Sequence, residues 1–62
     1  MRINLNGQPR FVEEGATLQD VLPSARGVAA ALNGSVVPAA SWESTPLSED
    51  DAVELVTAHQ GG

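Results

Sequence analysis

Residues 28–37 read VAAALNGSVV, a stretch of small and apolar residues with one Asn-Gly pair near its centre. An apolar run, Val28–Leu32, reaches the pair Asn33-Gly34, and a short apolar return, Val36-Val37, follows it. Asparagine and glycine both tolerate a positive φ, which the two-residue turns of β-hairpins require. The stretch therefore predicts a hairpin of two short strands.

A second stretch with the same signal lies near the N-terminus. Arg2–Leu5 alternates polar and apolar residues, Asn6-Gly7 follows, and Pro9–Val12 is the expected return strand. Proline cannot donate to a strand ladder, so Pro9 indicates an edge strand. Either Phe11 or Val12 should face inward.

A short helix is predicted between the two hairpins. Thr17 is suited to cap its N-terminus, with Asp20 in a near capping box. Four apolar residues then recur at helical spacing: Leu18, Val21, Leu22 and Ala25. Pro23 interrupts this stripe, so the helix should be kinked or should end near Leu22.

The C-terminal third of the sequence predicts one helical turn and one strand. Ser41–Ser44 is expected to form the turn, of α or 3₁₀ type, with Trp42 filling the core. After a polar turn at residues 48–51, Ala52–Ala58 alternates as a strand should. Val53 and Leu55 should lie on one face of it, and Glu54 and Val56 on the other.

The order hairpin, helix, hairpin, turn, strand predicts an α+β fold of the β-grasp, ubiquitin-like kind. We expect a mixed sheet of four to five strands, one main helix across one face, and a short helical turn. The last strand should lie centrally, beside the first. Residues 1–58 would form this domain, and residues 59–62 a flexible C-terminal tail.

Composition excludes several classes of function. Eight acidic residues oppose three arginines, for a net charge of −5, which argues against nucleic-acid binding. There is no cysteine and one histidine, so we expect no disulfide, no thiol nucleophile and no metal site. No apolar run suits a membrane span or a signal peptide, so the cytoplasm is the expected location. The 62 residues also include no lysine.

The ending Gly61-Gly62 directly follows the last predicted strand. One interpretation is a slack end. The other is that the carboxylate of Gly62 is a substrate, which ATP converts to an acyl adenylate that a sulfur or nitrogen nucleophile attacks. Glycines lack a Cβ, so they fit a narrow enzyme channel.

Four stretches of the sequence resemble the ThiS family of sulfur carrier proteins: INLNGQ, GATLQDVL, VAAALNGSVVPAASW and TPLSEDDAVELVTAHQGG. The third is the most specific. The resemblance implies that an E1-like enzyme, ThiF, adenylates Gly62, and that a sulfur donor system using cysteine sulfur converts it to a thiocarboxylate. Thiazole synthase, ThiG, would then take the sulfur into the thiazole of thiamine.

The resemblance also implies what this chain does not do. It would be no enzyme, would have no catalytic residues and would bind no cofactor, because ATP and Mg²⁺ belong to the activating enzyme. His59, Gln60 and Gly61 would thread into the partner with Gly62, and residues 60–62 are expected to be mobile in the free protein. Val56 and Ala58, on the sheet face away from the helix, would dock partners.

One departure from the family pattern concerns the turn before the last strand. The family usually has Asp-Gly-Asp there, whereas this chain has Glu49-Asp50-Asp51. Asp50 should therefore adopt a left-handed conformation, at a small cost in stability.

Alternative functions remain open from the sequence alone. They are a MoaD-like carrier for molybdopterin or another pathway, a modifier conjugated through Gly62, and an interaction module whose tail is incidental. Because the chain has no lysine, no copy of it can be conjugated to a side-chain amine of another copy, which weakens the second alternative. The immediate sulfur donor and the oligomeric state are not predicted.

Overall fold

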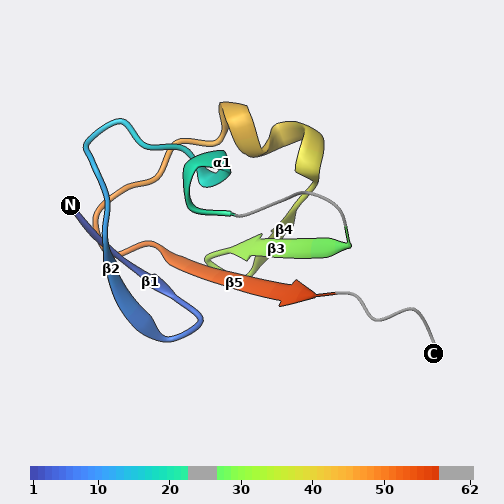
Figure 1. Cartoon of the computed structure of the whole chain (residues 1–62), viewed down its shortest axis with the longest axis horizontal. Helices are drawn as coiled ribbons and strands as arrows, with labels where there is room; N and C mark the ends of the chain where they lie inside the picture. The colour runs from blue at the N-terminus through green and yellow to red at the C-terminus, as the bar shows by residue number, and fades with distance from the viewer. Residues whose placement is uncertain (23–26, 58–62) are drawn as a thin grey trace.

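The computed structural model describes residues 1–22 and 27–57, and its strands form one mixed five-stranded sheet in the order β2-β1-β5-β3-β4 (Figure 1). The described elements are β1 (Arg2–Leu5), β2 (Gln8–Phe11), α1 (Leu18–Val21), β3 (Val28–Leu32), β4 (Ser35–Val37), the 3₁₀ helix η1 (Ala39–Ser44) and β5 (Ala52–Thr57). The last strand is central and lies parallel to the first, which confirms the β-grasp prediction.

Both Asn-Gly hairpins are confirmed. Leu5 pairs with Gln8 across the first turn, and Leu32 pairs with Ser35 across the second. Asn6 and Asn33 each have a φ of 51°, and their glycines are also positive, as a type I′ turn requires. Each two-residue turn therefore fixes the register of its hairpin.

The first return strand differs by one residue from its predicted range. It spans Gln8–Phe11, and Phe11 is 82% exposed, so the inward-facing residue is Val12. Val12 exchanges backbone hydrogen bonds with Met1, which extends the pairing of the two strands beyond Phe11.

The α-helix is a single turn. Its start is as predicted, because the Asp20 carboxylate accepts a 2.8 Å hydrogen bond from the Thr17 amide. It ends at Val21, and Leu22 is extended at φ −106° and ψ 136°. A proline at position 23 disfavours the helical conformation for the residue before it. The predicted continuation of the stripe to Ala25 lies outside the described residues.

The 3₁₀ helix η1 is longer than the single turn expected at residues 41–44. It begins directly after Pro38, whose φ of −60° directs the chain into it. Trp42 is completely buried, and its indole Nε1 donates a 2.9 Å hydrogen bond to the Val37 carbonyl. The prediction that Trp42 fills the core is confirmed.

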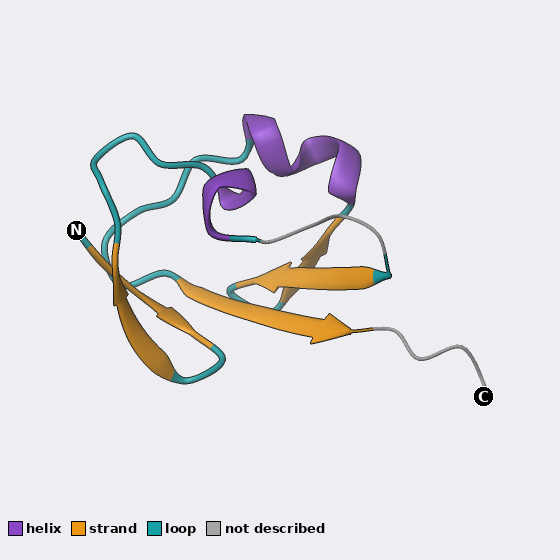
Figure 2. Cartoon of the chain, viewed as in Figure 1, coloured by secondary structure: helices purple, strands orange, loops and turns teal. Residues whose placement is uncertain are grey.

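The core lies between the sheet and the two helical elements, which cover the same face (Figure 2). Its buried side chains come from every layer of the fold: Ile3, Leu18, Leu22, Ala30, Trp42, Leu47 and Val53. The opposite face of the sheet has no helix over it in the part of the chain described. Among residues 1–22 and 27–57, no helix is long and apolar enough to cross a membrane.

Candidate functional site

Strand β5 leads to the C-terminal residues and is held on both edges. It pairs in parallel with β1, where Leu5 lies opposite Val53, and antiparallel with β3 over five positions, Val28 to Leu32. A central strand of this kind is among the last parts of a sheet to open. The residues after Thr57 therefore begin from a fixed point.

The first Asn-Gly turn also binds β5. The Asn6 amide donates to the Val53 carbonyl at 2.8 Å, and the Asn6 side-chain oxygen accepts from the Leu55 amide at 2.8 Å. Here the side chain replaces a strand residue, because the backbone has already turned toward β2. Asn6 thus extends the parallel pairing one step toward the C-terminus.

The second Asn-Gly turn binds the start of β5 from the other side. Asn33 exchanges two hydrogen bonds with Ala52, one through its backbone amide at 2.7 Å and one through its side-chain oxygen at 2.9 Å. Its side-chain nitrogen donates to the Asp51 carboxylate at 3.0 Å. Both turns therefore act as clamps on the strand that carries the tail.

The turn before β5 contains the left-handed residue that was predicted at Asp50. Asp50 has a φ of 69°, in the left-handed region. Its amide donates to the Arg2 carbonyl at 2.7 Å, and its carboxylate lies 3.4 Å from the Arg2 guanidinium. Both Arg2 and Asp50 are largely exposed, so this ion pair contributes little to stability.

The outer face of the sheet carries an apolar patch. Ala30 is buried, and side chains alternate along a strand, so Ala29 and Ala31 face outward. Ala29 lies opposite Val56, and Ala31 lies opposite Val36. We call Val36, Ala31, Ala29 and Val56 the outer patch.

The two valines of the outer patch are mostly exposed. Val56 is 63% exposed and Val36 is 77% exposed. The exposed side chain predicted for Val56 is therefore confirmed, whereas Ala58, His59, Gln60, Gly61 and Gly62 lie outside the described residues. Leu5 packs against the core and does not join the outer patch. The sequence did not identify Val36 as a patch residue, because its place beside Ala31 depends on the register of the hairpin.

Metal ligands do not gather in the part of the chain that the structure describes. No three histidine, cysteine, aspartate or glutamate side chains there are placed to share an ion. Residues Glu13, Glu14 and Asp20 line a surface groove beside α1. Acidic side chains repel phosphates, so this groove does not suit a nucleotide.

Comparison with known proteins decides the family. Residues 3–62 match the ThiS family, so the match runs through the C-terminal Gly-Gly pair. The chain belongs to the ThiS family. A sulfur carrier protein ThiS from Thermus thermophilus is 40% identical over 62 residues, which cover 94% of this chain and 95% of that protein.

A second relative is a larger protein. The thiazole synthase of Magnetococcus marinus is 36% identical over 66 residues, which cover all of this chain but 20% of that protein. The present chain therefore spans about a fifth of the synthase that it matches.

Solved structures of the ThiS family show the same fold. The crystal structure of the thiamine biosynthesis protein ThiS from Geobacter metallireducens is 28% identical and covers 100% of both chains, with a TM-score of 0.83. The solution structure of a thiamine biosynthesis protein from the same organism gives a TM-score of 0.74, covering 100% of this chain and 88% of the other.

Proposed function

We propose that Gly62 is where this ThiS-family sulfur carrier of thiamine biosynthesis bears its sulfur. An E1-like enzyme would join the Gly62 carboxylate to AMP at the expense of ATP, with Mg²⁺ in that enzyme's site. Sulfur from a donor system would then replace AMP and leave a thiocarboxylate. A thiazole synthase would take the sulfur and return the carboxylate.

The family match through Gly62 carries this proposal, because the reactive group is the terminal carboxylate itself. The described structure supports it in one respect. Hydrogen bonds from both turns hold strand β5 in the folded domain. The binding free energy of the docked domain could therefore offset the conformational entropy lost when the C-terminal residues are fixed in an enzyme channel. The chain would act as a substrate and carrier and not as an enzyme.

The Magnetococcus marinus relative supports the choice of synthase as the final partner. A segment similar to this entire chain forms part of a thiazole synthase there. Two units that occur in one polypeptide are candidates for a functional pair when they occur separately. We therefore propose a ThiG-like synthase as one partner and a ThiF-like adenylating enzyme as the other, both in the cytoplasm.

The outer patch is the surface that we propose for docking. It comprises Val56 of the predicted pair and extends onto β3 and β4, away from the two helical elements. Apolar side chains at the centre of an interface, with charge at its rim, are typical of protein–protein contacts. Glu54 lies opposite Ala31 at the edge of this patch and would face a basic partner residue.

The test is the intact mass of the chain after incubation with an extract of its host, ATP and cysteine. We expect a gain equal to one exchange of oxygen for sulfur, and loss of that gain when ATP is omitted. Deletion of Gly62 should abolish the gain. The matched control is Gln19→Glu, a substitution at an exposed position on α1. The control should gain the same mass as the unchanged chain.

Three other results would contradict the proposal. Gly62 joined by an amide bond to lysines of other proteins would indicate a conjugating modifier. A thiocarboxylate that supports molybdopterin but not thiazole formation would indicate a MoaD-like carrier. Unchanged function after deletion of Gly62 would indicate an interaction module.

A further inference from the structure

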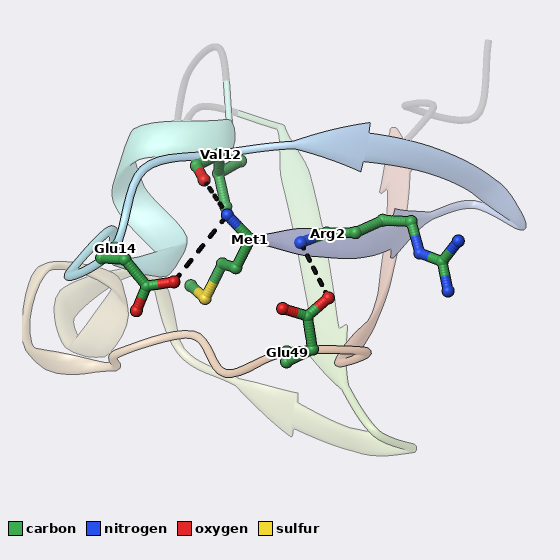
Figure 3. A network of polar contacts seen from close by, with 5 residues as sticks. All are labelled: Met1, Arg2, Val12, Glu14 and Glu49. Atoms are coloured by element: carbon green, nitrogen blue, oxygen red, sulfur yellow. Dashed lines mark hydrogen bonds and ion pairs between the residues drawn. The ribbon is translucent and has the colours of Figure 1, made fainter.

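The α-amine of Met1 is part of the β1–β2 ladder (Figure 3). It donates a 2.7 Å hydrogen bond to the Val12 carbonyl, and the Val12 amide donates back to the Met1 carbonyl at 2.8 Å. The Glu14 carboxylate lies 3.9 Å from the same amine. The Met1 side chain is 5% exposed and packs against the core, so the residue is held at both ends.

This amine has a special place in a chain without lysine. The side chains positively charged at neutral pH are three arginines, whose guanidinium groups stay protonated and are poor nucleophiles, and the imidazole of His59 is not a primary amine. In a chain that begins at Met1, the α-amine is therefore the one primary amine of the sequence. An activated acyl group at Gly62 would have no other amine of its own kind to react with.

The register of the sheet separates this amine from the C-terminal end of the same molecule. Asn4 lies opposite Ala52, and β5 runs away from that point to Thr57 while the chain from Asn4 back to Met1 runs the other way. At about 3.3 Å per residue these two segments together span about 26 Å. The five residues after Thr57 reach at most about 18 Å, even fully extended. Gly62 therefore cannot reach Met1 of its own chain in the folded protein.

We propose that the fold protects the activated carrier from aminolysis by its own amine. The reaction avoided is attack of the Met1 nitrogen on the Gly62 carbonyl carbon. The C–N bond would form, the bond from that carbon to the AMP oxygen would break, AMP would leave with the electron pair, and the nitrogen would lose one proton. Distance prevents this within one molecule, and the hydrogen bond from the amine to the Val12 carbonyl suppresses it between two.

The inference rests on the proposed role of Gly62, but its test needs no activating enzyme. The chain is prepared with Gly62 as a thioester of mercaptoethanesulfonate, by intein cleavage, and incubated at pH 8. The first variant carries a single glycine ahead of Met1, which moves the amine out of the ladder but adds only about 4 Å of reach, so Gly62 still cannot meet the amine of its own chain. The second carries the same extension with its amine acetylated. Amide-linked dimer is measured by intact mass, and circular dichroism confirms that all three chains are folded.

We expect the extended chain to form dimer about tenfold faster than the unextended one, which is what one lost hydrogen bond is worth. The acetylated chain should form none. A matched pair, Glu14→Gln and Glu13→Gln, separates the hydrogen bond to Val12 from the nearby charges. Because Glu14 is 86% exposed, neither change should alter the rate by more than about twofold. Equal rates for the extended and unextended chains would overturn the inference. That result would leave the thiocarboxylate assay, and with it the proposed function, unaffected.

Discussion

The side-chain oxygen of Asn6 accepts a hydrogen bond from the amide of Leu55, 49 positions along the chain, at 2.8 Å. Asn33 makes the equivalent contact with Ala52 from the opposite edge of β5. One residue type thus satisfies two demands at each turn. It accepts a positive φ, and it supplies the polar group that the central strand requires where a neighbouring strand has turned away.

The two clamps respond differently to aspartate. Asn6→Asp keeps an oxygen acceptor for the Leu55 amide, so the free energy of unfolding should change by less than about 0.5 kcal/mol. Asn33→Asp instead places a second carboxylate where the Asn33 amide now donates to Asp51 at 3.0 Å. We expect a loss of about 1–2 kcal/mol from the missing hydrogen bond and the repulsion. Urea unfolding at pH 7 measures both.

A second substitution checks the cause of that loss. In the double variant Asn33→Asp with Asp51→Asn, the donor and acceptor exchange sides, so most of the lost stability should return. If the double variant is less stable than Asn33→Asp alone, the hydrogen bond between residues 33 and 51 is not the cause of the lost stability.

The turn at Asp50 predicts opposite effects for two small residues. Its φ of 69° is strained for residues with a Cβ and unstrained for glycine. Asp50→Gly relieves this strain but increases the conformational entropy of the unfolded chain. The net effect should be a rise in the free energy of unfolding of about 0.5 kcal/mol. Asp50→Ala, which loses the same Arg2 ion pair but keeps a Cβ, should lower it by about 1 kcal/mol. Equal stability of the two variants would show that backbone strain is not the controlling factor.

The hairpins, the last strand and the burial of Trp42 could be predicted because each depends on local chemistry. Asn-Gly pairs determine a turn almost by themselves, and Trp42, the one tryptophan, is the largest side chain available to fill so small a core. Of the two outcomes predicted at Pro23, a kink or an end near Leu22, the structure has the second, since a proline restricts the residue before it.

The features that the sequence did not reveal depend on contacts between distant elements. The clamping role of Asn6 and Asn33 toward β5 requires knowing which strands are neighbours. The outer patch likewise needs the register that places Val36 beside Ala31. The length of η1 was missed because Ala39 and Ala40 carry no start signal beyond the preceding proline.

Trp42 should be the most sensitive core position. Trp42→Phe removes the donor to the Val37 carbonyl and leaves a void, because the Trp42 side chain is fully buried. We expect a loss of about 2–3 kcal/mol, which is a large part of the stability of a 62-residue domain. The control is Val36→Ala on the exposed outer patch, which should change stability by less than about 0.5 kcal/mol. Thermal unfolding of both variants distinguishes these outcomes.

The outer patch provides the last prediction. Val56→Glu and Val36→Glu each place a charge where the proposed partners would bury apolar surface, and each should lower the apparent affinity for a purified adenylating enzyme about tenfold. Ala40→Glu adds the same charge to η1, on the other face of the domain, and should leave affinity unchanged. Titration of each folded variant against the enzyme gives the affinities directly. If all three variants bind equally well, the partner does not use this face, and the tail alone must account for recognition.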